Sequence, residues 1–125
     1  MHDNIILVPY RDRQTHLDYF LKTTVPLLKQ GLPKSKVIIV EQSPGKLFNR
    51  GKLLNVGFKE HEGQTQYFIT NDVDINPKER TINDLYSPEI KEDNLIRGIY
   101  NNKHGTLGGL IKMLSLPSLS RKINL

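Results

Sequence analysis

The chain has 125 residues and a formal net charge of +5 at pH 7, and it contains no cysteine. A chain of this length is expected to fold as one domain, and 37% hydrophobic with 25% charged residues favours a globular protein over a disordered or membrane-embedded one. The lack of cysteine excludes disulfides, thiolate metal sites and cysteine nucleophiles, so any metal would be bound by oxygen or histidine ligands.

No apolar stretch of the sequence is long enough to span a bilayer, and Met1-His2-Asp3-Asn4 leads directly into a predicted strand without the features of a signal peptide. We therefore expect a cytoplasmic chain without a membrane segment. The excess positive charge lies in the last third, because no Asp or Glu follows Asp93. That third lacks the interleaved aromatic residues of a base-stacking surface, so we expect a solvated basic face and no nucleic-acid partner.

Apolar runs at residues 5–8, 37–40 and 67–70 predict three buried strands, because they are β-branched or aromatic and are bounded by turn-forming residues. Helix-forming sequence lies between them. The order β-α-β-α-β predicts an α/β fold, an open sheet of mainly parallel strands with helices on both faces.

The first predicted helix is capped by Thr15 and is kinked or broken at Pro26. A shorter helix is predicted over residues 52–60. Residues 78–94 are polar and are expected to form a loop with at most short helical turns, and residues 110–116 are apolar without a clear period.

Polar residues follow each predicted strand at once, at positions 9–13, 41–43 and 71–74. In open α/β sheets ligands bind outside the carboxyl ends of the strands. We therefore expect these three polar segments to converge on one crevice that carries the chemistry.

Asp72 and Asp74 are the most informative pair in these segments. They lie at the tip of a buried strand, where a period of two places both carboxylates on one side and Val73 on the other. Paired carboxylates suit Mg²⁺ or Mn²⁺, with the remaining ligands supplied by water and substrate phosphates. The alternative is a pair of turn-forming aspartates before Pro77.

Arginines could complement such a cation by binding phosphates. Arg11 and Arg13 alternate around Asp12 and could hold a diphosphate through bidentate hydrogen bonds. Phe48 could stack on a base or sugar beside the cationic Arg50. The alternatives are solvated arginines and a core phenylalanine.

Several of these segments match known patterns closely. Val8-Pro9-Tyr10-Arg11-Asp12-Arg13 matches V-P-[FY]-R-[ND]-R, and the run from Phe48 to Phe58 matches F-N-R-[AG]-K-L-L-N-[VI]-G-[FY]. Asp72-Val73-Asp74 matches D-V-D, and Gly108-Gly109 is similar to an F-G-G segment with Leu107 in place of Phe. Together they resemble the β-1,4-galactosyltransferase family of glycosyltransferases.

The resemblance implies a GT-A fold, a UDP-sugar donor (UDP-galactose or a related hexose), Mn²⁺ or Mg²⁺ as cofactor, and inverting transfer to a hydroxyl of a carbohydrate acceptor. It implies metal binding by Asp74 as the direct ligand, with Asp72. It implies donor binding by Pro9, Tyr10, Arg11, Arg13, Phe48, Arg50, Asp72, Val73, Gly108 and Gly109.

The sequence also departs from the family. The family's W-G-W-G-x-E-D-D-D segment, which supplies the acceptor site and the catalytic carboxylate, does not occur here, and neither do its later methionine and histidine metal ligands. Arg121-Lys122-Ile123-Asn124 is similar to the K-I-N-G that lies just before that segment. We therefore expect residues 1–125 to form a single nucleotide-sugar-binding domain that lacks the acceptor and catalytic segment. The alternatives for its origin are a truncated fragment, a natural short form, and a domain that another chain or a homo-oligomer completes.

Two other functions stay open at this point, and no catalytic residue is assigned. One is a non-catalytic module that binds nucleotide-sugars. The other is a metal-dependent phosphotransferase or phosphatase that uses Asp72 and Asp74.

Overall fold

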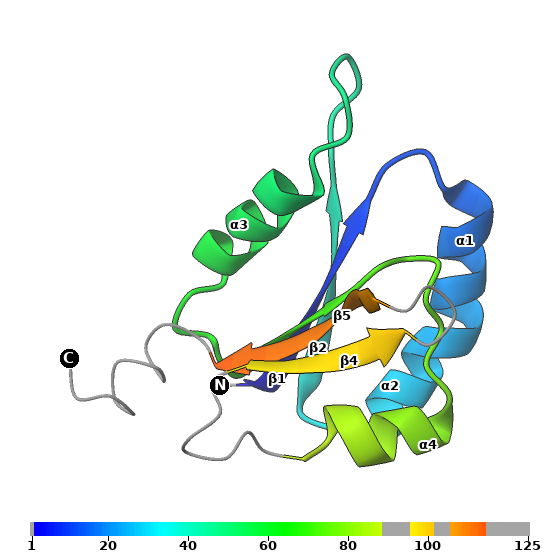
Figure 1. Ribbon diagram of the computed structural model, residues 1–125, viewed down its shortest axis with the longest axis vertical. Coiled ribbons are helices and arrows are strands. Elements are labelled where there is room, and N and C mark those ends of the chain that lie inside the picture. Colours follow the sequence, from blue (N-terminus) through cyan, green and yellow to red (C-terminus); the bar gives the residue numbers. More distant parts are fainter. Residues whose placement is uncertain (1, 89–95, 102–105, 115–125) are drawn as a thin grey trace.

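The protein is represented by a computed structural model, which describes residues 2–88, 96–101 and 106–114 (Figure 1). The described residues form a five-stranded sheet with the order β2-β1-β3-β5-β4. The elements in chain order are β1 (His2–Tyr10), α1 (Gln14–Tyr19), the π-helical η1 (Phe20–Thr24), α2 (Val25–Gly31), β2 (Ser35–Glu41), α3 (Arg50–Glu60), β3 (Thr65–Asn71), α4 (Glu79–Thr81), the π-helical η2 (Ile82–Tyr86), β4 (Ile96–Asn101) and β5 (Thr106–Leu114).

The predicted β-α-β-α-β order is confirmed for β1, β2 and β3. Strand β1 lies between the other two and is parallel to both. Strand β5 then joins the sheet antiparallel to β3, with β4 antiparallel to β5 at the edge. Four of the five strands therefore run in one direction, but β4 and β5 were not predicted as strands.

Helices cover both faces of the sheet, as predicted (Figure 1). Successive β1 side chains point to opposite faces, so Ile6 and Val8 belong to one buried cluster whereas Ile5 and Leu7 belong to another. The first cluster packs against residues of η1, α2 and η2, and the second packs against α3. In the described part of the chain, no helix is long and apolar enough to cross a membrane.

Two details of the first helical region differ from the predictions. Helix α1 begins at Gln14, so Thr15 lies inside it, and the capping position belongs to Arg13, whose side chain makes no capping hydrogen bond. Pro26 does not break the helical path, because the π-helical η1 ends just before it and Pro26 lies in the first turn of α2.

Helix α3 begins with a side-chain cap, since Asn49 Oδ1 accepts a hydrogen bond from the backbone N of Lys52 at 3.0 Å. It spans two residues more than the predicted 52–60. The loop predicted after Pro77 contains the short helical segments α4 and η2, and η2 contributes the buried Ile82 and Tyr86 to the core.

The end of α2 gives a stability prediction. A Cβ at Gly31 would lie 2.6 Å from Cγ2 of Ile82, which is 1% exposed and cannot move freely. We expect Gly31→Ala to lower the free energy of unfolding by about 1–3 kcal/mol, the usual effect of overpacking.

Gly51→Ala is the matched control, because a Cβ there would meet nothing closer than Asn49 Oδ1 at 3.8 Å. Urea unfolding of both variants measures the difference. Equal stabilities would show that α2 and η2 do not pack as described.

Candidate functional site

A cavity of about 460 Å³ opens at the carboxyl ends of the parallel strands. It is formed by the segments that follow β1 and β3 and by the segment that precedes and begins α3. Its lining residues are Pro9, Arg11, Asp12, Arg13, Phe48, Arg50, Asp72, Val73 and Asp74. The predicted crevice is therefore present at the ends of β1 and β3, and eight of the residues assigned to ligand binding from the sequence line it. Residues 41–43 were also expected in it, but they do not line it.

The segment after β1 turns sharply at Asp12, whose φ of 52° lies in the left-handed region that few residues other than glycine adopt. Arg11 Nη1 donates a hydrogen bond to the carbonyl of Lys46, and its guanidinium carbon lies 5.8 Å from the centre of the Phe48 ring. Arg11 therefore connects the end of β1 to the loop between β2 and α3.

Tyr10 was predicted to contact the donor, but the structure places it in the core. Its side chain is 5% exposed and belongs to the cluster of Ile6 and Val8, and its hydroxyl lies 3.4 Å from Oε1 of Gln14. The alternation of the strand explains this, because positions 6, 8 and 10 point to the same face.

The segment after β2 shapes the cavity indirectly. The side chain of Gln42 donates to the carbonyl of Leu47 at 2.9 Å and accepts from the backbone N of Asn49 at 2.8 Å. These bonds fold the loop that presents Phe48, whose side chain is 44% exposed. Sequence reasoning missed this role of Gln42, and its only signal was a position directly after a buried strand.

The acidic segment is a turn and not a continuation of β3. The strand ends at Asn71, and the backbone N of Ile75 donates to the carbonyl of Asp72 at 3.0 Å. The predicted period-two alternation was therefore wrong, because it holds only within a strand. Both carboxylates nevertheless line the cavity, and the side chain of Val73 is 6% exposed and packs in the core.

The two carboxylates have different surroundings. Asp72 Oδ1 lies 2.7 Å from Nε of Arg50 in a half-buried ion pair. Asp74 is exposed and makes no hydrogen bond or ion pair with the residues that the structure describes. Asp74 is thus the carboxylate that is free to take a cation from solvent.

The cavity balances three arginines against three aspartates. Arg50 is paired with Asp72, and Arg11 lies 3.9 Å from Asp12 between the nearest charged atoms. Arg13 is exposed and has no partner within the described ranges. The cavity therefore offers one unpaired cation and one unpaired carboxylate, which suit an anion and a metal ion respectively.

Gly108 and Gly109 lie in β5. Because Asn71 pairs with Leu110 in an antiparallel register, these glycines extend β5 past the end of β3, at the edge of the sheet where the acidic turn lies. The 121–124 segment falls outside the described residues.

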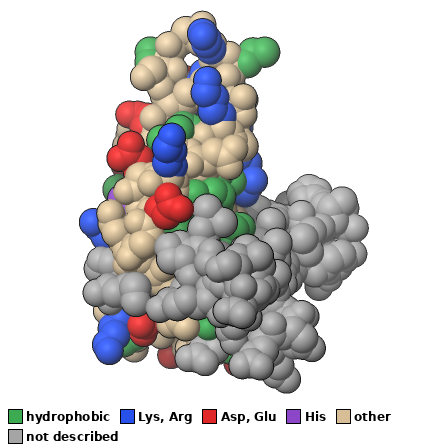
Figure 2. Space-filling model, turned by 90° about the vertical axis from the view of Figure 1, so that its left-hand side faces the viewer, with side chains coloured by type: hydrophobic (Ala, Val, Ile, Leu, Met, Phe, Trp, Pro, Cys, Tyr) green, Lys and Arg blue, Asp and Glu red, His purple; other side chains and the backbone are tan. Residues whose placement is uncertain are grey.

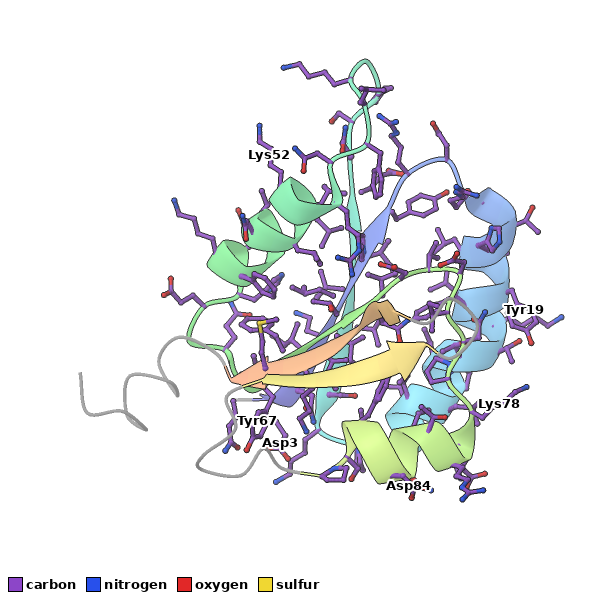
Figure 3. All side chains as sticks on the ribbon, viewed as in Figure 1. Asp3, Tyr19, Lys52, Tyr67, Lys78 and Asp84 are labelled. Atoms are coloured by element: carbon purple, nitrogen blue, oxygen red, sulfur yellow. The ribbon has the colours of Figure 1, made fainter. Side chains whose placement is uncertain are left out.

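Charges on the described surface are mixed. On the face shown in Figure 2, basic and acidic side chains lie among one another over the upper part of the molecule. Figure 3 shows the two ends of the sheet, with Lys52 in the first turn of α3 near the carboxyl edge and Asp84 at the opposite end.

The sequence profile of the N-terminal region of glycosyl transferase group 7 matches residues 1–87, which include every residue that lines the cavity. The chain belongs to the glycosyltransferase group 7 family. The resemblance inferred from the motifs is thereby confirmed.

Relatives in this glycosyltransferase family include human β-1,4-galactosyltransferase 4, which is 41% identical over 95 residues, and bovine β-1,4-galactosyltransferase 1, which is 40% identical over 78 residues. These matches cover 74% and 61% of this chain but only 27% and 19% of the respective relatives. The chain thus corresponds to a minor part of each of these enzymes.

Solved structures show the same fold. The catalytic domain of Drosophila β-1,4-galactosyltransferase 7 in complex with xylobiose superimposes with a TM-score of 0.72 and 26% identity, over 92% of this chain and 50% of that one. A variant of the same enzyme, in complex with manganese, UDP-Gal and xylobiose, gives a TM-score of 0.71 at 24% identity, with the same coverage. The GT-A fold expected from the sequence is confirmed.

Proposed function

We propose that this chain binds a UDP-sugar, UDP-galactose or a related hexose, together with Mn²⁺ or Mg²⁺, as the donor-binding part of a galactosyltransferase-like enzyme. The observation that carries the proposal is the cavity at the carboxyl edge, where arginine, aromatic and carboxylate side chains meet. The Drosophila relative, solved with manganese and UDP-Gal, supports it.

Each group of the donor has a suitable partner in the cavity. Arg13 and Arg11 would donate charge-assisted hydrogen bonds to the diphosphate. The exposed face of Phe48 would stack on the uracil ring, and Pro9 and Val73 would form the apolar wall beside it. Arg50 would add positive charge while it holds Asp72 in place.

The carboxylates fit a hard divalent cation. Asp74 offers two unengaged oxygens, and Asp72 offers the oxygen that does not bond to Arg50. No cluster of three or more potential ligands was found among the described His, Cys, Asp and Glu residues, so a cation here would complete its shell with water and donor phosphates. When bound, the metal would act as a Lewis acid that stabilises the UDP leaving group.

We also propose a carbohydrate hydroxyl as the acceptor, by analogy with the xylobiose in the Drosophila complexes. Inverting transfer needs a general base to take the proton of that hydroxyl. We assign this base to no residue between positions 1 and 125.

Calorimetric titration tests the proposal. We expect UDP to bind more tightly with Mn²⁺ than without it, and more tightly than uridine in either condition, because only UDP presents phosphates to the arginines and the cation. If UDP binds no more tightly than uridine, the proposal is wrong.

Product assays separate the alternatives. Release of phosphate from simple phosphate esters would favour a phosphatase or phosphotransferase. Tight UDP binding without release of UDP from UDP-galactose, under any acceptor, would favour a non-catalytic binding module.

A further inference from the structure

The acidic turn is held from inside the protein by Asn71. This side chain is fully buried, and its Nδ2 donates to the carbonyls of Asp72 at 2.8 Å and Ile75 at 3.0 Å. The turn's own hydrogen bond, from the backbone N of Ile75 to the carbonyl of Asp72, lies between the same two residues. One amide group therefore fixes both ends of the turn that carries Asp74.

Tyr86 fixes the orientation of that amide. Its hydroxyl donates to Oδ1 of Asn71 at 2.5 Å, which leaves Nδ2 as the only part of the amide that can face the turn. Tyr86 is fully buried, and burial raises the pKa of its hydroxyl far above the usual value, so it remains a neutral donor. Lys112 holds the end of η2 against the sheet, since its Nζ donates to the carbonyl of Tyr86 at 2.7 Å.

A second hydroxyl acts on the other side of the turn. Thr24 Oγ1, which comes from η1, donates to Oδ1 of Asn76 at 2.7 Å. Thr24 is also fully buried. The acidic turn thus lies between two asparagines, and each of them accepts a hydrogen bond from a buried hydroxyl on a separate π-helical segment.

We propose that Tyr86 and Thr24 are positioning residues that hold the 72–75 turn in its cation-binding conformation before any ligand arrives. The proposal rests on the proposed function, because it takes Asp74 and Asp72 as the groups that bind the metal. Neither hydroxyl contacts the cavity. If the turn were mobile in the free protein, metal binding would have to order it, and this entropy cost would weaken the metal affinity. The two hydroxyls remove the cost by ordering the turn before the metal binds.

Tyr86→Phe tests the proposal, since it removes the hydroxyl and keeps the ring in the core. We expect the Mn²⁺ dissociation constant in the presence of UDP, measured by electron paramagnetic resonance, to rise about fivefold, which corresponds to one neutral hydrogen bond. The dissociation constant of uridine should rise less than that of Mn²⁺, because Phe48 and Pro9, two of its three proposed contacts, lie outside the turn and only Val73 belongs to it. Exchange of the Ile75 amide with solvent should accelerate.

Ile82→Val is the matched control, because Ile82 lies in the same segment and is as buried, but its side chain takes no part in the hydrogen bonds that hold Asn71. It should lower stability through one lost methylene group and leave both the Mn²⁺ affinity and the Ile75 exchange as in the wild type. If it raises the Mn²⁺ dissociation constant as much as Tyr86→Phe does, the effect is general loosening and the proposal fails.

Thr24→Val gives an independent measurement, and it decides the question if Tyr86→Phe does not fold. It should also weaken Mn²⁺ binding, and weaken uridine binding less. If Tyr86→Phe and Thr24→Val fold and bind Mn²⁺ as tightly as the wild type, the proposal is wrong. If the wild type itself binds no Mn²⁺ with UDP, the proposed function fails, and exchange at Ile75 still shows whether the two hydroxyls hold the turn.

Discussion

Replacement of Asp74 by asparagine will largely abolish the stabilisation of this protein by Mn²⁺ with UDP. For the wild type, a hundredfold excess of ligand over its dissociation constant stabilises the folded state by about 2.7 kcal/mol, or about 10 °C in Tm for a domain of this size. Asparagine cannot supply the anionic oxygen that a hard cation prefers, so the Mn²⁺-dependent part of the shift should vanish. Melting curves of both proteins with UDP alone, with Mn²⁺ alone and with the two together measure this Mn²⁺-dependent shift in Tm.

The unliganded Asp74→Asn protein should be as stable as the wild type, because Asp74 makes no bond with the described residues that the change could break. Asp84→Asn is the control: it changes the same charge on an exposed side chain at the end of the molecule away from the cavity (Figure 3). If Asp74→Asn keeps the full shift, the metal is bound elsewhere and the proposed function loses its cation site.

Arg13→Ala will weaken UDP by about 10- to 100-fold, because a hydrogen bond to a charged group contributes about 1.5–3 kcal/mol. Uridine has no phosphate and should bind to this variant as it does to the wild type. Arg80→Ala removes an equal charge from a side chain that is 93% exposed and lies outside the cavity, and it should change neither affinity.

Arg11→Ala should behave differently from Arg13→Ala. Arg11 also bonds to the carbonyl of Lys46 and stacks near Phe48, so its loss loosens the loop that would contact the base. We expect both UDP and uridine to bind more weakly to Arg11→Ala. Calorimetry with the two ligands measures this, and equal losses of UDP and uridine affinity in Arg13→Ala would contradict its assignment to the phosphates.

The parts of the fold that could be predicted are those determined by local sequence. The runs 5–8, 37–40 and 67–70 are apolar enough to be strands in any context, and the polar residues after them had to meet at one edge of a parallel sheet. Strands β4 and β5 could not be predicted in this way. Their sequences contain glycines and polar residues, and the strand conformation depends on pairing with β3, which is distant in the chain.

The candidate site likewise has features set by local sequence and features set by residues distant in the chain. Asp72 and Asp74 were identifiable because they follow a buried strand, but the turn that presents them depends on Tyr86, 15 residues away. Nothing near Tyr86 in the sequence marks it as part of the site. Tyr10 is the reverse case, since its place among polar residues suggested a ligand contact, whereas the alternation of β1 takes it into the core.

The position of β2 at the edge of the sheet has a consequence for assembly. Its apolar run from Val37 to Val40 packs against both clusters of the core, yet one side of its backbone has no strand beside it among the described residues. Such an edge is a template on which another chain can add a strand and begin to aggregate. The exposed Lys36 and Glu41 flank the run at its two ends, and charges in these positions discourage that growth.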